Sequence, residues 1–330
     1  EVRNQMLVSV LDAQAIDFVD KGRGKKVMVD LDSANPTGPL HVGHARGAVF
    51  GDALASILEE CGFRVERNYY LNDAGSQVDT LISSVIIRYR QLCGEDVHIA
   101  EGMYPGEYLV EIATKIKGQF SDNILETLQD ISKIRELIIN EILALIKHDL
   151  ARLNTKHDSF TSELQDVQSK QMIEKAIDLL QAKKLVYRGV LEAPKGIENQ
   201  DWEPKEQLLF KATEFGDDVD RVIVKSDGAY TYFAGDLGLA YHRYAQDLRD
   251  VVIVLGADHV GYVKRMKALY SALAPEFKVD LPVTQLVNLM NNGAPVKMSK
   301  RSGNFITVGD VIDEVGKDIL RFHAAIWPGM

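Results

Sequence analysis

Two histidines separated by two residues stand at the start of a predicted helix. The segment Ser33–His44 reads SANPTGPLHVGH and follows an apolar run at 27–31 that is typical of a buried strand. Apolar residues recur at helical spacing over 42–58, so His41 and His44 would share one face of the first turn. A helix N-terminus has unpaired N–H groups and a positive dipole end, which together attract phosphate. The spacing therefore predicts a nucleotide-binding loop.

Two alternatives exist for the same pair of histidines. They could be exposed surface residues, or they could belong to a metal site. A zinc site needs Cys or further His ligands at fixed spacing, and none lies nearby. Gly43, between the histidines, leaves room for a flat group close to the backbone. We therefore favour a nucleotide over a metal and expect no metal-binding residues.

A second segment rich in cations lies 253 residues after His44. Residues Lys297–Asn304 read KMSKRSGN, ahead of a helix predicted to begin near Val308. Three cations beside glycine and serine are typical of a mobile, basic loop.

Polar turns follow two further strand-like runs. The run at 63–71 ends in Asn72–Gln77, NDAGSQ, and the continuous apolar run at 251–255 ends in Gly256–Tyr262, GADHVGY. Strands that alternate with helices indicate a parallel sheet with right-handed crossovers, and ligands bind beyond the carboxyl ends of such strands. The sequence therefore predicts an α/β fold with a doubly wound parallel sheet and a site at that edge.

The pattern divides the chain into five parts. They are a short helix with a basic linker, the first half of the sheet domain, a helical insertion, a second half that includes β-rich runs, and the basic loop with the start of a helical region. These parts cover residues 1–26, 27–92, 93–156, 157–296 and 297–330. The insertion carries no residues that suggest chemistry, so we expect its helices only to pack. In the second half, a helix is predicted around Leu239–Tyr244.

Composition narrows the class of protein. The 330 residues are 46% hydrophobic and 26% charged, as in ordinary globular proteins. Cys61 and Cys93 form no CxxC pair, and no apolar run reaches membrane-spanning length. We therefore expect a cytoplasmic protein without membrane contact. The net charge of −10 means that any contact with nucleic acid must use local patches.

The motifs resemble those of a known family. HVGH at 41–44 resembles the HIGH motif of class I aminoacyl-tRNA synthetases, and KMSKR at 297–301 resembles their KMSKS motif, with Arg for the final Ser. Further segments resemble bacterial arginyl-tRNA synthetases, over 35–40, 70–75, 232–236, 256–262 and 301–304. The resemblance covers about residues 27–322 and implies a Rossmann-like catalytic domain. It also implies that an N-terminal tRNA-binding domain and a C-terminal anticodon-binding domain are absent from this chain.

The resemblance implies activation of L-arginine by ATP to arginyl-adenylate, and transfer of arginine to tRNA(Arg). In that family His41 and His44 would hydrogen-bond the phosphates, while Lys297 and Lys300 would close over the pyrophosphate. Mg²⁺ would accompany ATP, held largely by the phosphates. The resemblance further implies that arginine activation requires bound tRNA. The other positions expected to bind ATP are Pro36, Gly43, Gly256, Asp258, Met298, Ser299 and Arg301.

The same resemblance implies a pocket for the arginine side chain. A guanidinium ion has five donors in a planar fork and pairs best with carboxylates. Glu163, Tyr232 and Asp236 would surround it. The residues expected to hold the amino and carboxyl end of the substrate are Asn35 and His259, with help from Ser33. Two alternatives stay open, since Tyr232 could be a strand residue that packs on the sheet and Asp236 could cap the following helix.

Other functions are less consistent with these residues. A cysteine-specific synthetase would show zinc ligands, and a glutamate-specific one would place Arg in the pocket rather than Asp236 and Glu163. A noncatalytic, synthetase-like binding protein would be favoured by loss of a motif histidine or lysine, and all four are present. We expect a monomer.

Overall fold

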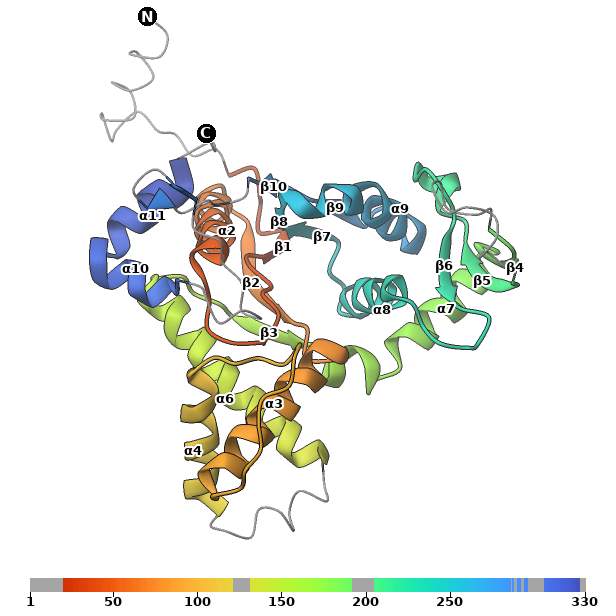
Figure 1. The fold of residues 1–330 in the computed structure, drawn as a ribbon. Coiled ribbons are helices and arrows are strands. Elements are labelled where there is room, and N and C mark those ends of the chain that lie inside the picture. The colour runs from red at the N-terminus through yellow and green to blue at the C-terminus, as the bar shows by residue number, and fades with distance from the viewer. Residues whose placement is uncertain are drawn as a thin grey trace, which may run out of the picture.

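The structure is a computed structural model that describes residues 20–120, 131–191, 205–285, 287, 290–291, 294–295 and 306–326. Among these residues, five strands form one parallel sheet in the order β3-β2-β1-β7-β9 (Figure 1). The strands are β1 (Lys26–Asp30), β2 (Arg64–Leu71), β3 (Ser159–Ser162), β7 (Asp250–Ile253) and β9 (Lys278–Asp280). The expected N-terminal helix lies outside the described residues. The predicted parallel sheet is confirmed.

Helices cover both faces of this sheet. Successive side chains of β1 point to opposite faces, and apolar residues lie on each of the two faces. Val27 and Val29 pack with Ala55 of α2 (Val42–Glu60). Met28 points to the other face and joins the core cluster of α8 and α9. These two helices are α8 (Tyr232–Ala245) and α9 (Val263–Leu273), and Figure 1 shows α2 and α8 on opposite sides of β1. The sheet is therefore doubly wound.

The close approach of α2 to β1 depends on Gly51. A Cβ atom there would lie 2.7 Å from the Cα atom of Leu31, which is fully buried. We expect Gly51→Ala to lower the free energy of unfolding by about 1–3 kcal/mol, because the helix must move off the strand. Urea denaturation measures this difference.

Gly47 supplies a matched control on the same helix. A Cβ atom at this position would lie 3.4 Å from Asp32 Oδ1, an ordinary contact. Gly47→Ala should therefore leave stability unchanged or raise it by up to about 1 kcal/mol through helix propensity. Equal stabilisation by both alanines would contradict the tight packing at Gly51.

A group of helices connects β2 to β3; the last two lie within residues 93–156, where a helical insertion was expected, and the first precedes them. Figure 1 shows them together, projecting below the sheet. They pack into the same core cluster as α2. The helices are α3 (Ser76–Leu92), α4 (Tyr108–Phe120) and α6 (Ile131–Arg152).

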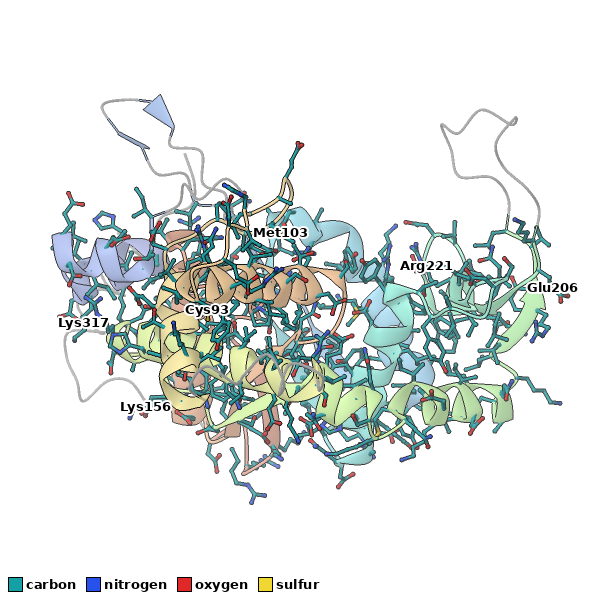
Figure 2. The ribbon with its side chains drawn as sticks, turned by 60° about the horizontal axis from the view of Figure 1, so that its bottom comes forward. Cys93, Met103, Lys156, Glu206, Arg221 and Lys317 are labelled. Carbon is teal, nitrogen blue, oxygen red and sulfur yellow. The ribbon has the colours of Figure 1, made fainter. Side chains whose placement is uncertain are left out.

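A small antiparallel sheet follows α7 (Met172–Ala182), where β-rich runs were expected. Its strands are β4 (Val186–Gly189), β5 (Gln207–Phe210) and β6 (Arg221–Val224). In Figure 2, Glu206 and Arg221 of this sheet lie at one end of the molecule and Lys317 lies at the other. The small sheet is thus remote from the helices that end the described chain.

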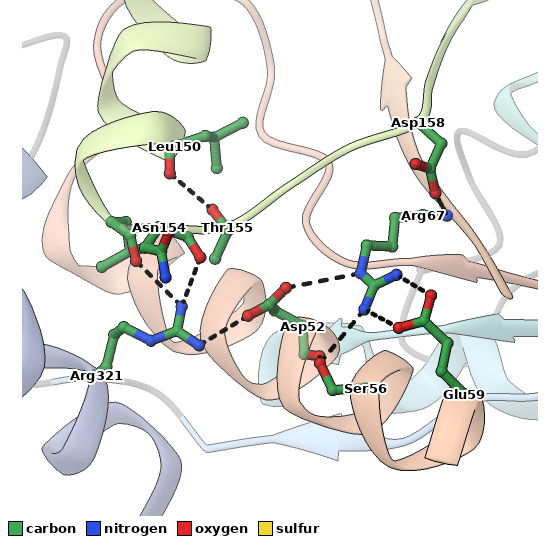
Figure 3. A network of polar contacts seen from close by, with 10 residues as sticks. Asp52, Ser56, Glu59, Arg67, Leu150, Asn154, Thr155, Asp158 and Arg321 are labelled. Carbon is green, nitrogen blue, oxygen red and sulfur yellow. Dashed lines mark hydrogen bonds and ion pairs between the residues drawn. The ribbon is translucent and has the colours of Figure 1, made fainter. Parts of the chain in front are cut away.

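Those last helices, α10 (Val308–Val315) and α11 (Lys317–Ile326), return to α2. Arg321 donates to Asp52 Oδ2 of α2 at 2.7 Å and to the carbonyl of Leu153 at 3.0 Å (Figure 3). Asp52 also lies 3.7 Å from Arg67 Nε, and Arg67 forms a bidentate pair with Glu59. This network fastens α11 to α2 and to the chain after α6.

One helix begins earlier than predicted. α8 begins at Tyr232 rather than near Leu239, because Phe233, Ala234 and Leu237 face the core at helical spacing. The β-prone residues and Gly235 at its start hid this in the sequence, and packing decided the outcome. The structure also contains α9, which the pattern did not predict. No helix within the described residues is long and apolar enough to cross a bilayer.

Candidate active site

The two motif histidines lie at the N-terminus of α2, as predicted. His41 is the N-cap, and its Nδ1 atom accepts a hydrogen bond from the Gly43 N–H at 3.1 Å. His44 Nδ1 accepts from the His41 N–H at 3.2 Å, which completes a reciprocal capping box. The two rings stack with centroids 3.6 Å apart. Both imidazoles are therefore oriented by the backbone at the helix end.

These hydrogen bonds define the tautomer of each ring. An Nδ1 atom that accepts a hydrogen bond carries no hydrogen, so each neutral ring holds its hydrogen on Nε2. An Nε2–H group is a donor suited to a phosphate oxygen. The helix terminus then adds its own positive potential.

Gly43 has a steric role within the helix cap that the sequence did not indicate. A Cβ atom at this position would lie 2.8 Å from Cε1 of His41. The glycine therefore makes room for the folded-back imidazole of the N-cap. Binding of a flat ligand against Gly43 stays a prediction.

The loop before His41 is fastened at three points. The Tyr69 hydroxyl donates to the Ala34 carbonyl at 2.8 Å, and the Tyr108 hydroxyl donates to the Thr37 carbonyl at 2.6 Å. The Leu40 N–H donates to Asp149 Oδ2 at 3.0 Å. Tyr108 and Asp149 belong to α4 and α6 of the insertion, whose helices were expected only to pack. No local pattern in the sequence marks either residue for this role.

Ser33, Asn35 and Pro36 lie on the same loop. The Ser33 hydroxyl accepts from the Tyr70 N–H at 3.2 Å, and the Asn35 amide donates to Gln77 Oε1 at 3.0 Å. Pro36 is buried. Ser33 is thus joined to β2 and Asn35 to α3, at the carboxyl edge of the sheet.

The second motif lies outside the described residues, but its flanks do not. The Val308 N–H donates to the Leu40 carbonyl at 2.8 Å, and Thr307 pairs with His41 in an antiparallel bridge. On the other flank, Arg46 of α2 donates to the Gln285 carbonyl at 3.3 Å. Both flanks therefore meet the histidine helix. The predicted site residues left undescribed are Lys297, Met298, Ser299, Lys300 and Arg301.

Two carboxylates come together beyond β3. Glu163 begins a π-helical turn, Glu163–Gln168, and its Oε1 atom would lie 3.5 Å from a Cβ atom at Gly235 of α8. Glu163 accepts hydrogen bonds from Gln168 at 3.2 Å and from the Tyr70 hydroxyl. With its amide oriented to satisfy both polar atoms, Asn72 also donates to Glu163 at 2.7 Å. Asp236 follows Gly235 on α8, and the charge of Glu163 acts on it; binding of a guanidinium group by this pair stays a prediction.

Burial raises the pKa of both carboxyl groups. Burial raises the pKa of Asp236 to about 7; the Arg265 cation opposes this, and the Glu163 carboxylate adds to it. Burial also raises the pKa of Glu163. Two partly buried carboxylates that are costly to ionise form a site suited to a cation.

The structure decides between the alternatives for Tyr232 and Asp236. Tyr232 is not a strand residue, since it is the first residue of α8 and its side chain is 90% exposed. Asp236 is not the N-cap, a position that Thr231 occupies. Asp236 lies in the second turn of α8, with Glu163 beside it.

A buried polar chain holds α8 against β1. Arg243 forms an ion pair with Asp30 and donates to the Tyr270 hydroxyl at 2.6 Å. Asp30 also accepts from Asn68 of β2 at 2.8 Å. Burial by itself would lower the pKa of Arg243, but the Asp30 carboxylate and Tyr270 raise it. Because Arg243 stands seven residues after Asp236, on the same side of α8, this network helps to fix the side of the helix that carries Asp236.

The segment that begins with β8 (Leu255–Gly256) follows β7, the strand paired with β1. A Cβ atom at Gly256 would lie 2.5 Å from Asp258 Oδ1, so glycine permits that aspartate conformation. His259 Nε2 lies 3.4 Å from Asp258 Oδ2, and both side chains are at least half exposed. Among the described residues, no hydrogen bond joins His259 to Ser33 or Asn35.

Comparison with known proteins identifies the family of the chain. The family model for "tRNA synthetases class I (R), catalytic domain" matches residues 6–322. The arginine–tRNA ligase of Ruegeria pomeroyi is 52% identical over 316 residues, which cover 95% of this chain and 54% of that protein. The chain thus spans about half the length of the curated relatives it matches.

Solved structures show the same fold. A Campylobacter jejuni protein, solved under a provisional assignment as an arginyl-tRNA synthetase, is 31% identical with a TM-score of 0.77, over 96% of this chain and 68% of that one. Thermus thermophilus arginyl-tRNA synthetase is 18% identical with a TM-score of 0.62, over 92% of this chain and 57% of that one, and supports the fold alone. The chain therefore belongs to the family of class I tRNA synthetases (R), of which it carries the catalytic domain.

Proposed function

We propose that this chain activates L-arginine with ATP to form arginyl-adenylate and transfers the arginyl group to tRNA(Arg). The observation that carries the proposal is the pair Glu163 and Asp236 at the same sheet edge as the histidine helix. β3, which leads to Glu163, is separated from β1, which leads to the histidine loop, by β2 alone. A site for a cation thus lies close to a site for phosphate.

Arginine would enter with its guanidinium group between Glu163 and Asp236. The planar fork can donate to both carboxylates, and each ionises more readily once the cation is present. Tyr232, exposed at the start of α8, would cover the side chain. Ser33, Asn35 and His259 would hold the amino and carboxyl end. The positive charges of Arg243 and Arg265 would repel the guanidinium group of the substrate. Binding of arginine therefore depends on both Glu163 and Asp236 being ionised.

In adenylation, a carboxylate oxygen of arginine attacks the α-phosphorus of ATP. A new O–P bond forms while the bond from that phosphorus to pyrophosphate breaks. The Nε2–H groups of His41 and His44 would donate to phosphate oxygens as negative charge shifts during this exchange. Lys297 and Lys300 would neutralise the leaving pyrophosphate. The remaining contacts to ATP are assigned to Pro36, Gly43, Gly256, Asp258, Met298, Ser299 and Arg301.

The hydrogen-bond donors at the N-terminus of α2 suit phosphate better than they suit a magnesium ion. They are imidazole and backbone N–H groups, which suit phosphate, whereas Mg²⁺ prefers oxygen ligands and retains water. Among the described residues, no group of three or more His, Cys, Asp or Glu side chains could hold a metal. Mg²⁺ would therefore arrive bound to the phosphates of ATP, whose charge it neutralises.

The flanks of the undescribed loop support convergence of the two motifs. Thr307 lies seven residues after Lys300 and pairs with His41. Seven residues span at most about 25 Å when extended, so the length of the chain allows Lys300 to reach the N-terminus of α2. The acidic net charge confines tRNA contacts to local patches. We further propose that the protein works as a cytoplasmic monomer, with domain boundaries near residues 26, 92, 156 and 296.

ATP–pyrophosphate exchange tests the function. The full-length protein, with tRNA(Arg) present, is expected to exchange pyrophosphate into ATP when L-arginine is added. Citrulline, which replaces the guanidinium with a neutral urea group, should support exchange at least about 10²-fold less well, since it leaves the acidic pair without a cation. If cysteine or glutamate supported exchange and arginine did not, the assignment would be wrong.

A further inference from the structure

The peptide just before His41 is held from two sides by distant parts of the chain. Leu40 is fully buried, and its N–H donates to Asp149 of α6 at 3.0 Å. Its carbonyl accepts from the Val308 N–H at the start of α10, at 2.8 Å. The insertion and the segment after the second motif therefore meet at this single residue.

Asp149 is well placed to hold that peptide still. It is 7% exposed, and its neighbours on the buried face of α6, Ile142, Ile146 and Leu150, are at most 2% exposed. The end of α6 is also tied to α10 by an ion pair between Arg152 and Asp313. The acceptor thus stands on a helix that is packed into the core and joined to α10, on the other side of Leu40.

We propose that Asp149 is a positioning residue that sets the place of the His41 and His44 imidazoles for phosphate binding. This inference rests on the proposed function, since it assigns those imidazoles to ATP. His41 follows Leu40 directly, so a shift of the Leu40 peptide moves the N-cap. The capping box then transmits the shift to His44. Asp149 touches no reacting atom and acts through the backbone.

Tyr108 supplies a second hold from the same insertion. Its hydroxyl donates to the Thr37 carbonyl at 2.6 Å. Gly38, with φ of +144°, lies against its ring, since a Cβ atom there would be 2.8 Å from Tyr108 Cζ. The insertion therefore positions the loop at two places, and the Leu40 contact is the one nearest the histidines.

The test compares Asp149→Leu with Asp149→Asn in the full-length protein. Leucine removes the acceptor and excludes water, whereas the asparagine oxygen can still accept from Leu40. We expect Asp149→Leu to lower kcat for arginine-dependent exchange by roughly 10²-fold, because displacement of about 1 Å has that effect. KM for arginine should change less than kcat, because the acidic pair lies on other elements and Ser33 and Asn35 are held separately by Tyr70 and Gln77. Asp149→Asn should remain within about threefold of wild type, since a neutral acceptor keeps the geometry.

Two further variants complete the design. Glu136→Leu removes an exposed carboxylate from the same helix and should leave kcat unchanged. Tyr108→Phe should lower kcat by roughly 2- to 10-fold through loss of one hydrogen bond.

Hydrogen exchange of the Leu40 amide should accelerate in Asp149→Leu alone. If Asp149→Leu does not fold, Tyr108→Phe and Asp149→Asn decide the matter, and a Tyr108→Phe protein with wild-type kcat overturns the proposal.

Other outcomes also count against the inference. It is overturned if Asp149→Leu folds and keeps its kcat, if Glu136→Leu is equally impaired, or if Asp149→Asn is as defective as Asp149→Leu. Calorimetric binding of ATP separates this inference from the proposed function. Should wild type show no arginine-dependent exchange, the proposed function fails. Whether or not exchange is seen, equal affinity for ATP in wild type and Asp149→Leu would overturn the positioning role of Asp149.

Discussion

Replacing Asp236 with asparagine is expected to raise KM for arginine roughly 10²- to 10³-fold at pH 8, as loss of one partner of a buried charge pair does. The substitution removes one of the two carboxylates proposed to bind the guanidinium and leaves Glu163 alone. Because the proposed role of Asp236 involves the substrate side chain rather than the phosphates, KM for ATP should change little. Pyrophosphate exchange at varied arginine concentration measures both constants.

The pH dependence of the same site has a definite sign. Burial raises the pKa of Asp236 to about 7, and only the ionised carboxylate attracts the arginine cation. The affinity for arginine should therefore be full above pH 7 and weaken by up to about tenfold per pH unit below it. The charges of Arg265, Glu163 and Arg243 act on Asp236, and the charge of Asp236 in turn contributes to the raised pKa of Tyr70. The component due to Asp236 should be absent in Asp236→Asn.

The thermal stability of Asp236→Asn shows whether a raised KM reflects loss of the carboxylate or misfolding of the variant. The pKa of Asp236 is about 7 in the folded state and about 3.9 in an unfolded chain, so the folded state binds the proton more tightly. Stability therefore falls as pH rises from about 4 to 7, and asparagine removes that loss. Asp236→Asn should melt at the same or a higher temperature than wild type at pH 8. Asp247→Asn is the matched control, because Asp247 is 93% exposed just beyond α8. A normal KM in Asp236→Asn would contradict the proposed pocket.

His44→Ala is expected to lower kcat for adenylation by about 10²- to 10³-fold, the usual effect of removing one donor to developing charge. The imidazole donates through Nε2–H because its Nδ1 atom accepts from the His41 N–H. KM for arginine should change little, since the acidic pair is untouched. Steady-state exchange kinetics separate the two constants.

His44 also caps α2, so a second variant is needed. His44→Gln keeps an acceptor that can reach back to the N-cap N–H, as glutamine does in a capping box. It should regain thermal stability that alanine loses, while kcat stays low because the amide donor is placed differently. His98→Ala, at a histidine that is 83% exposed, serves as the control and should be fully active. Wild-type kcat in both His44 variants would remove His44 from the phosphate site.

Local patterns in the sequence determined the ends of strands and the start of α2. The sequence placed His41 and His44 at the N-terminus of a helix. The signals were strand periodicity, a loop with Pro and Gly, and helical spacing of apolar residues, all of which involve neighbouring residues only. The alternation of strands and helices, which predicted the parallel sheet, is also a local pattern of apolar residues. The acidic residues Glu163 and Asp236 came from resemblance, since neither carries a local signal of partnership.

Tertiary packing decided the rest. α8 begins at Tyr232 because its apolar face meets α7 and the sheet, which overrides the β-propensity of its first residues. Leu40 and Asp149 are 109 residues apart, and no periodicity reports a hydrogen bond across that separation. The raised pKa of Asp236 likewise arises from burial among groups that only the folded chain brings together. The sequence alone thus determined which residues could bind phosphate, and the tertiary structure decided what holds them in place.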